Sequence, residues 1–349
     1  MFLLGDRFLK FFFDCYFMEY DFEEDRIIDE IKDRNAKKIL IQLPEGIKKE
    51  AFKIAESIKI NSNVDIIISG SSCWGGCDLA VEEAKKIKAD LLIHFGHAPF
   101  VKIDFPVLYI ELYSKLDIVK LLKSNVKNLK INKIGLVGSV QYIKQLGKIK
   151  EYLKSEDKEV FIPKKKGFAA YDGHVVGCEY NSLKTIEGEV DGFLVIGNKF
   201  HSLGAALMCV NKDVYLLNEQ SNKLEMMNSE RDKVIRQRAI AIDKVKRANK
   251  IGIVVDNKIG QYNMKIAEGL KRDLERLEKE AVIIVVNEFS PSLMNFYNVD
   301  AFIDTACPRI AIEDCGKYDK PIINSREASV VVGKRSWEEL LDKGLIGFV

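Results

Sequence analysis

Several features are scarce or missing in this 349-residue sequence, and each absence narrows the possible functions. Basic and acidic residues nearly balance, with 54 Lys and Arg against 52 Asp and Glu, so no excess charge favours nucleic acid or a membrane surface. No dinucleotide or flavin fingerprint is evident. We therefore expect no membrane partner and no direct nucleic-acid partner, and any redox step would need an external electron donor.

Residues 1–18 are rich in apolar side chains. Four charged side chains interrupt this segment, it is too short to span a bilayer, and no small-residue cleavage site follows it. We expect an N-terminal extension over residues 1–20, with Met18 as a candidate for the true start. Because no secretory signal is present, we expect a cytoplasmic location.

One structural plan recurs three times along the chain. Each copy opens with an apolar burst, followed by a turn and a periodic helix, which predicts strands at 37–43, 132–138 and 249–255. Later in each copy an aspartate precedes a second apolar strand, at Asp90, Asp191 and Asp300. A further predicted strand closes each copy, at 106–110, 214–217 and 321–323.

This alternation of strands and helices predicts an α/β protein with mostly parallel sheets flanked by helices. We expect three similar domains in a pseudo-threefold arrangement, at 21–130, 131–248 and 249–349. Ligands of such sheets bind beyond the carboxyl ends of the strands, so three copies could direct three such edges toward one centre. Three stacked domains with separate sites are the alternative, since a fold alone does not fix a function.

The seven cysteines indicate metal binding or catalysis, because thiols in the cytosol stay reduced. Each copy has a cysteine at a strand end or in a glycine-containing loop: Cys73 and Cys77 in GSSCWGGCDLA, Cys178 in GHVVGCE and Cys307 in DTACPR. Three thiolates on a four-iron cluster would leave one iron open to a substrate, whereas an electron-transfer cluster normally has four cysteine ligands. The number of candidate ligands therefore favours a catalytic cluster.

The remaining cysteines leave some alternatives open. Cys73 and Cys77 form a close pair, but a structural zinc site usually has a second close pair, and none with that spacing is evident. Cys73 itself stays an alternative cluster ligand. Cys209 has apolar neighbours on both sides and is predicted to pack as a small hydrophobe, while Cys315 is predicted to be a bystander.

Four motifs occur in order through the three copies: WGGCD at 74–78, IHFGH at 93–97, Gly177-Cys178 and TACPR at 305–309. Together with the repeat, they resemble the archaeal enzyme family of the first step of diphthamide biosynthesis, over nearly the whole chain after Met18. The resemblance implies a 4Fe-4S cluster bound by Cys77, Cys178 and Cys307. Ala80 stands where the common radical motif C-x3-C-x2-C would place its third cysteine, as expected of an atypical enzyme.

The same resemblance implies a reaction and its partners. The activity would be that of a 2-(3-amino-3-carboxypropyl)histidine synthase, which uses S-adenosylmethionine as its substrate. The 3-amino-3-carboxypropyl group would be transferred as a radical to C2 of a histidine in elongation factor 2, leaving methylthioadenosine. The resemblance also implies a homodimer.

Candidate contacts to S-adenosylmethionine follow from its charged amino acid end. Gln261 and Arg309, which resemble family positions, are predicted to bind the carboxylate, for which a guanidinium is well shaped. An ion pair from Arg309 to Glu313 is the competing interpretation. Glu45 or Asp304 is predicted to accept from the ammonium group, or else to cap a helix.

His94 and His97 lie on either side of Gly96, where the apolar strand predicted after Asp90 ends. Gly96 and His97 are predicted to contact the substrate, or His97 to steer the acceptor histidine; the competing interpretation is a turn that only caps the strand. His94, inside the apolar run, is predicted to be a buried structural histidine. The sequence identifies no dedicated base.

Two rival functions remain at this point. A quinolinate-synthase-like 4Fe-4S lyase or dehydratase would also combine three α/β repeats with three cysteine ligands. A redox-sensing or scaffold protein would use the cluster structurally. Formation of methylthioadenosine by the reduced protein distinguishes the transferase from both.

Overall fold

The computed structural model describes residues 20–347, which form two compact units. Unit 1 contains the described residues up to Ile118 together with Val140–Lys144, and unit 2 contains Val119–Ser139 and Gln145 onward. Met18, Cys15 and nearly all of the expected N-terminal extension lie outside the described residues. Among residues 20–347, every helix is too short or too polar to cross a membrane.

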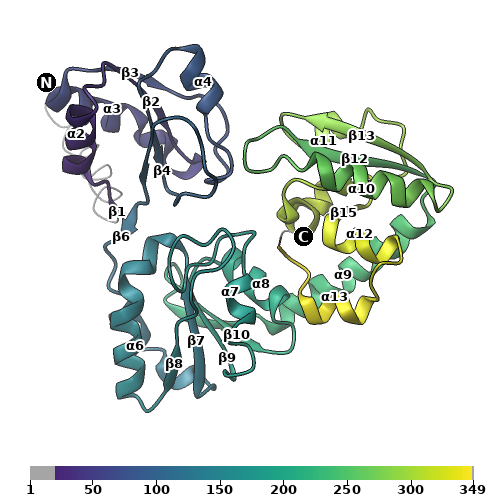
Figure 1. Ribbon diagram of the computed structural model, residues 1–349. Coiled ribbons are helices and arrows are strands. Elements are labelled where there is room, and N and C mark those ends of the chain that lie inside the picture. Colours follow the sequence, from purple (N-terminus) through teal and green to yellow (C-terminus); the bar gives the residue numbers. More distant parts are fainter. Residues whose placement is uncertain (1–19, 348–349) are drawn as a thin grey trace, which may run out of the picture. The chain divides into compact units, whose positions relative to one another are not determined.

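Unit 1 is built on a parallel sheet of four strands in the order β3-β2-β4-β5 (Figure 1). Alternate residues of the strands face opposite sides, so that Ile39 and Ile41 pack with α2 and α3 while Leu40 packs with α4. The strands are β2 (Lys38–Gln42), β3 (Asp65–Ile68), β4 (Leu91–Phe95) and β5 (Val107–Ile110). The helices are α2 (Glu24–Asp33), η1 (Glu45–Glu50), α3 (Ala51–Ser62) and α4 (Val81–Lys86).

Two short strands and one turn of helix complete unit 1. β1 (Tyr20–Asp21) pairs with β6 (Tyr113–Ser114) in an antiparallel ribbon. The 3-10 helix η3 (Val140–Gln145) contributes its first five residues to this unit. There the Gln141 side-chain amide donates to the Gly96 carbonyl at 2.8 Å, and the Lys144 ammonium lies over the Tyr113 ring.

Unit 2 contains two sheets, the first in the order β11-β10-β9-β7-β8, parallel except for β11. Helix α6 packs against β7 and β8, while α8 and α9 share an apolar cluster with residues of β7, β9 and β10. The strands are β7 (Lys133–Gly138), β8 (Glu159–Phe161), β9 (Gly192–Gly197), β10 (Asp213–Asn218) and β11 (Lys223–Met226). The helices are α5 (Ile118–Lys123), η2 (Val126–Asn128), α6 (Leu146–Ser155), α7 (Asn181–Lys184), α8 (Lys199–Met208) and α9 (Asn228–Arg247).

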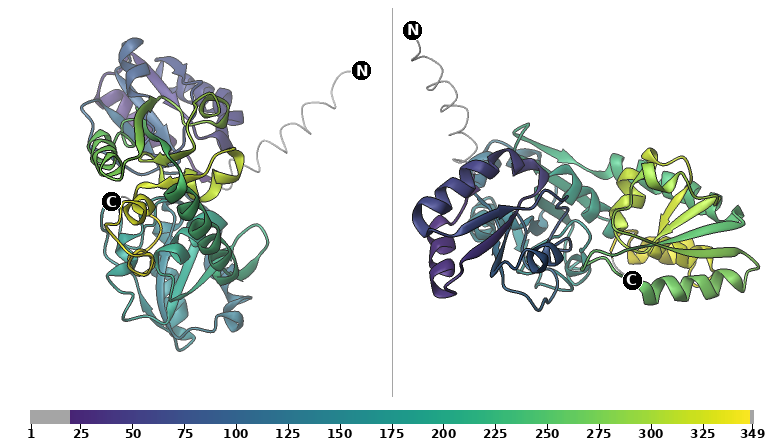
Figure 2. Two further views of the ribbon diagram at one scale, coloured as in Figure 1. Left: turned by 90° about the vertical axis from the view of Figure 1, so that its right-hand side faces the viewer. Right: turned by 90° about the horizontal axis from the view of Figure 1, so that it is seen from above.

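The second sheet of unit 2 is parallel, in the order β13-β12-β14-β15, with helices along both sides (Figure 2). On one side Ile251 and Ile253 pack with α9, α10 and α12, and on the other Val254 packs with α11 and η4. The strands are β12 (Lys250–Asp256), β13 (Glu280–Val286), β14 (Ala301–Asp304) and β15 (Ile322–Asn324). The helices are α10 (Met264–Glu275), α11 (Pro291–Met294), the π-helix η4 (Ile310–Asp314), η5 (Cys315–Lys317), α12 (Ser325–Val331) and α13 (Trp337–Lys343).

The three sheets share one topology, in which the first strand of each copy lies between the second and the third, and the fourth follows the third. This confirms the α/β class, the mostly parallel sheets and the repeat that the sequence predicted. One apolar cluster runs through both sheets of unit 2, from Phe193 and Val195 to Ile251 and Ile303. The division into three domains stays a prediction.

The recurring aspartates have the same structural role in each copy. The Asp90 carboxylate accepts from the backbone N–H groups of residues 37 and 38 at 2.7 and 2.9 Å. Asp191 and Asp300 accept from the corresponding pairs, 132–133 and 249–250, at 2.8 to 3.0 Å. Each aspartate therefore clips the start of the third strand of its copy to the start of the first, and these hydrogen bonds lower the pKa of each carboxyl.

Candidate functional site

The loop that carries Cys77 runs from β3 to α4 in unit 1. The Asp78 N–H donates to the Gly75 carbonyl at 3.0 Å, which makes a tight turn around Cys77. A Cβ at Gly76 would lie 2.6 Å from the Ala98 carbonyl oxygen, so only glycine fits there. The Gln42 side chain ties the loop to β2, since its amide donates to the Asp78 carbonyl at 2.7 Å and its oxygen accepts from the Ala80 N–H at 3.0 Å.

Gln42 also contacts the first of two histidines at the end of β4, the buried His94, and His97 beside it is half-buried. The parallel register places Gln42 beside His94, whose Nδ1 lies 2.8 Å from the Gln42 Oε1. The His94 Nε2 in turn lies 3.0 Å from the His97 Nδ1. Burial lowers the pKa of His94 well below its usual value and that of His97 to about 4, so both rings are neutral at pH 7. The predicted burial of His94 is confirmed.

Cys73, which precedes Cys77 in the same loop, lies beside these histidines. Its sulfur and one nitrogen of each histidine ring are within 4.8 Å of one another. Cys73 is buried, and its backbone N–H donates to the Glu45 carboxylate at 3.2 Å. Burial, followed by the neighbouring carboxylates of Asp78 and Glu45, raises the pKa of the Cys73 thiol.

Two other predicted contacts lie close to this loop. The exposed Glu45 carboxylate binds the Lys48 ammonium at 3.0 Å as well as the Cys73 N–H. Gly96 has a φ of +85°, and a Cβ there would lie 2.9 Å from the Pro44 ring, so its place after β4 requires glycine. The structure therefore brings Glu45, Gly96 and His97 to the same edge of the unit 1 sheet, at the carboxyl ends of β2 and β4.

In unit 2, Cys307 follows β14 directly. The Asp304 Oδ1 accepts from the N–H groups of Ala306 and Cys307 at 2.8 and 3.3 Å, which fixes the backbone at this cysteine. The Asp304 Oδ2 is buried and has no hydrogen-bond partner among residues 20–347. Burial, only partly offset by the two backbone hydrogen bonds, raises the pKa of Asp304 to about 8.

The loop of Cys178 contacts the segment after Cys307. The Cβ position of Gly177 is 3.4 Å from the Arg309 Cδ, and the Arg309 guanidinium lies 3.0 Å above the centre of the Phe200 ring. Cys178 itself is buried. Two of the three candidate cluster cysteines thus lie on segments joined through Arg309, and Phe200 completes this contact.

Arg309 makes the ion pair that the competing interpretation predicted, with the Glu313 carboxylate at 2.9 Å. Its Nε is nevertheless buried without a hydrogen-bond partner in the described part of the chain. Gln261 is buried just before α10, and the Asn263 amide donates to the backbone carbonyls of both Gln261 and Thr305. Gln261 is therefore connected to the TACPR segment through Asn263.

Cys209 packs in the core as predicted, while the bystander role of Cys315 stays a prediction. Cys209 is fully buried in the apolar cluster of unit 2, and the Cys315 sulfur lies 3.9 Å from the Ile312 carbonyl oxygen in the turns after Arg309. None of the six cysteines of residues 20–347 forms a disulfide.

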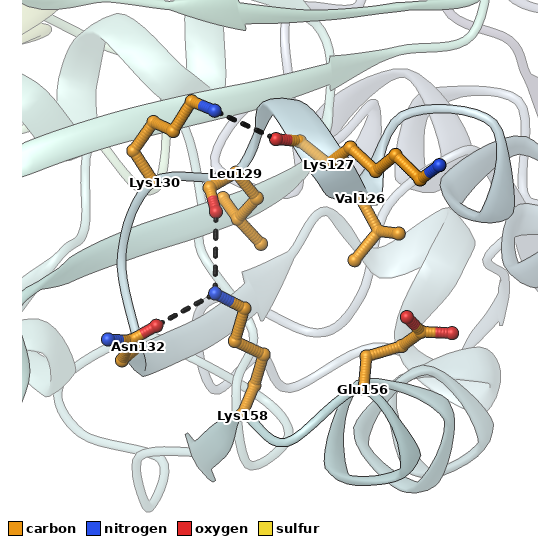
Figure 3. Close-up of a pocket in the computed structure, with 7 residues that line it drawn as sticks. All are labelled: Val126, Lys127, Leu129, Lys130, Asn132, Glu156 and Lys158. Carbon is orange, nitrogen blue, oxygen red and sulfur yellow. Dashed lines mark hydrogen bonds between the residues drawn. The ribbon is translucent and has the colours of Figure 1, made fainter.

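A pocket in unit 2 contains none of these residues (Figure 3). Three lysines surround it, and the ammonium groups of two already bind protein oxygens. Lys130 donates to the Lys127 carbonyl, and Lys158 donates to the Leu129 carbonyl and the Asn132 side chain (Figure 3). The hydrogen bonds of these lysines stabilise the turn before β7, so the pocket adds nothing to the candidate site.

The sequence interpretation missed two residues at these sites. Gln42 ends β2 beside His94, and the repeat itself held the signal, because the first and third strands of each copy are neighbours. Phe200 supports Arg309 from the start of α8, and nothing in its local sequence indicated that contact.

Comparison with known proteins connects the two groups of residues to one family. Residues 43–341, which include Cys77, Cys178 and Cys307, match the family described as "Putative diphthamide synthesis protein". The chain belongs to this diphthamide synthesis family. The resemblance seen in the four motifs is thereby confirmed.

Relatives in this family match almost the whole chain. A protein of Pyrococcus horikoshii named 2-(3-amino-3-carboxypropyl)histidine synthase is 32% identical, over 91% of this chain and 92% of its own. The synthase of the same name from Methanocaldococcus jannaschii is 30% identical, over 93% of both chains. The crystal structure of Dph2 from Pyrococcus horikoshii with a 4Fe-4S cluster superposes with a TM-score of 0.86 at 30% identity, covering 95% of this chain and 96% of that one.

Proposed function

We propose that this protein is a 2-(3-amino-3-carboxypropyl)histidine synthase, which transfers the 3-amino-3-carboxypropyl group of S-adenosylmethionine to C2 of a histidine in elongation factor 2. The main support for the proposal is the structural similarity, over 95% of this chain, to a family member crystallised with a 4Fe-4S cluster. The reaction is the first step of diphthamide biosynthesis. It takes place in the cytoplasm, in a homodimer that receives electrons from an external donor.

The residues of this chain fit a 4Fe-4S cluster with an open iron. Cys77, Cys178 and Cys307 form no disulfide and lie in loops that follow strands of parallel sheets, and each copy of the repeat supplies one. Gly76 lets the backbone pass close to its neighbours at Cys77, and Asp304 fixes the backbone at Cys307. When bound, the cluster supplies the electron that breaks a C–S bond of S-adenosylmethionine and releases methylthioadenosine.

Arg309 is the proposed partner of the substrate carboxylate. Its Nε is a buried donor without a partner among the described residues, and a buried donor left unpaired is costly. Phe200 holds the guanidinium plane from one side and Glu313 binds one of its terminal nitrogens, so the orientation of the fork is fixed. Gln261 is the second proposed donor to the carboxylate, connected to the same segment through Asn263.

Glu45, Gly96 and His97 are the proposed contacts from unit 1. Glu45 carries an exposed carboxylate, which suits the substrate ammonium group. Gly96 keeps the chain at the carboxyl end of β4 free of a side chain. All three lie at the sheet edge where ligands of parallel sheets bind.

The test is anaerobic incubation of the iron-reconstituted protein with dithionite and S-adenosylmethionine, with and without archaeal elongation factor 2. Mass spectrometry should detect methylthioadenosine and a 3-amino-3-carboxypropyl adduct on one histidine of the factor. Serine substitution of Cys77, Cys178 or Cys307 should abolish both products, while Cys209→Ser, a buried thiol in the apolar core, should retain them. A fully reduced, cluster-loaded protein that makes neither product would refute the transferase and favour the lyase.

A further inference from the structure

We propose that Cys73, His94 and His97 form a second metal site, which binds one thiophilic divalent cation, Zn²⁺ or Fe²⁺, independently of the cluster cysteines. The three residues come from two segments of unit 1, the loop after β3 and the end of β4. Their candidate ligand atoms lie within 4.8 Å of one another, and Cys73 and His94 are buried. The site would therefore fasten the loop of Cys77 to the central strands of the sheet.

The hydrogen bonds of Gln42 determine which nitrogen of His94 is free to bind a metal. The Gln42 amide donates to the Asp78 carbonyl and its oxygen accepts from the Ala80 N–H, so both ends of the side chain are assigned. The His94 Nδ1, 2.8 Å from that oxygen, must then carry the proton. The His94 Nε2 consequently directs its lone pair toward His97. A metal-binding histidine characteristically donates its other N–H to an oxygen in this way.

The spacing of the two imidazoles suits a shared ion. The His94 Nε2 and the His97 Nδ1 are 3.0 Å apart. Two nitrogens at zinc bond lengths of about 2.0–2.1 Å in a tetrahedron would be roughly 3.3 Å apart, so the rings need to separate only slightly. The Cys73 sulfur lies within 4.8 Å of both nitrogens, and it would have to come to about 3.6 Å from each to complete a tetrahedral set. One thiolate and two imidazoles are ligands that prefer Zn²⁺ or Fe²⁺ to Mg²⁺ or Ca²⁺.

The charges around Cys73 favour a cation over an empty site. The carboxylates of Glu45 and Asp78 act on the thiol, and only the Lys48 ammonium opposes them. The lone pair of the His94 Nε2 is available because the other ring nitrogen donates to Gln42. On binding, the metal displaces the Cys73 proton to solvent and the thiolate becomes its ligand, so charge and protons balance.

Three protein ligands leave one tetrahedral position for water or another exogenous ligand. With the ion in place, His97 is a metal ligand, and this role replaces the direct substrate contact proposed for it above. The ion positions the Cys77 loop through Cys73 without being part of the cluster.

The experiment measures zinc and iron together, by plasma mass spectrometry, in the full-length protein reconstituted anaerobically with iron and sulfide and then given ZnCl₂ and desalted. We expect about one zinc per chain in addition to about four irons. Cys73→Ser and His97→Gln should each lose most of the zinc and keep the iron. Cys77→Ser should lose iron and keep zinc, and Cys209→Ser should keep both. Gln42→Ala should lower zinc affinity about 10–100-fold.

A second measurement removes the contribution of the cluster ligands. In the full chain with Cys77, Cys178 and Cys307 all replaced by serine, added Co²⁺ should give a thiolate-to-cobalt absorption band that disappears with Cys73→Ser. Zinc that stays below a tenth of an equivalent per chain, or zinc and cobalt signals unchanged in Cys73→Ser and His97→Gln, would overturn the proposal. Either result would leave the transferase proposal intact, because the cluster and methylthioadenosine formation are measured separately.

Discussion

Replacing Arg238 by methionine should strongly destabilise unit 2. Arg238 is 1% exposed on α9, and it binds both oxygens of Glu327, which is 0% exposed, at 2.6 and 2.7 Å. It also donates to the Ala311 carbonyl at 2.5 Å and to the Ile322 carbonyl at 2.7 Å. Burial alone would lower the pKa of Arg238, but attraction to Glu327 outweighs that effect and raises the pKa, so the guanidinium stays charged.

The expected loss follows from the polar groups that lose their partner when methionine replaces the arginine. A buried carboxylate without its partner costs about 3–5 kcal/mol, although the Asn324 N–H still donates to Glu327. The two carbonyls add on the order of 1 kcal/mol each where water cannot reach them. A total of about 5–7 kcal/mol is comparable with the whole stability of many domains, about 5–15 kcal/mol. Because the Ala311 carbonyl belongs to the π-helix just after Arg309, the variant should also retain less iron.

Urea unfolding followed by circular dichroism, with iron measured per chain, tests both consequences. Arg236→Met is the matched control, since Arg236 is exposed on the same helix and should change stability by less than about 0.5 kcal/mol. Glu327→Gln combined with Arg238→Met should be less destabilising than the sum of the two single changes, because no lone buried charge remains. A loss below about 1 kcal/mol for Arg238→Met would refute this reasoning.

Three other changes test separate features of the structure. Burial lowers the pKa of His97 and of His174 from 6.5 to about 4. The unfolded chain therefore binds protons at a higher pH than the folded chain does. Lowering the pH from 6.5 to 4 should reduce the free energy of unfolding by about 3 kcal/mol for each of these histidines. His174→Gln should flatten this pH profile in urea titrations, and an unchanged slope would contradict the burial argument. Gly204→Ala should lower the free energy of unfolding by about 1–3 kcal/mol in thermal melts, because its Cβ would lie 2.1 Å from the Tyr180 hydroxyl. Gly147→Ala is the control, and it should be neutral or stabilising because nothing lies within 4 Å of its Cβ. Arg309→Lys should raise the KM for S-adenosylmethionine far more than it changes iron content, since lysine lacks the planar fork, and equal loss of iron would indicate a structural role instead.

The repeated architecture was predictable from the sequence because its signals are local. An aspartate before each third strand accepts from two backbone N–H groups at the start of the first strand, and a carboxylate does this whatever the surrounding core. The apolar bursts identified the buried central strands, such as β4 and β9, which have no exposed residue. Periodicity predicted the strands and the repeat, whereas the strand order and the hydrogen bonds of these aspartates were first seen in the structure.

The contacts within the sites were less predictable because they join distant segments. Arg309 lies on Phe200, more than a hundred positions earlier in the chain, and Gln42 binds both the Cys77 loop and His94. The ion pair of Arg309 with Glu313 was predicted, since residues four apart on a helical turn are neighbours. Contacts between segments far apart in the chain, such as Arg309 with Phe200, depend on packing, which a single sequence does not specify.

The positions of the candidate ligands show why the repeat alone could not identify the site. Cys77 and Cys178 occupy equivalent places, between the second and third strands of their copies, in the β3–β4 and β8–β9 connections. The equivalent β13–β14 connection has no cysteine, and Cys307 instead follows β14, one connection later. Because the strands of a parallel sheet end at the same edge, either connection can present a thiol there. The repeat therefore indicates which edge of each sheet holds the candidate ligands. It does not indicate which loop at that edge supplies each cysteine. Only the motifs around the candidate cysteines distinguish them from the other cysteines of the chain.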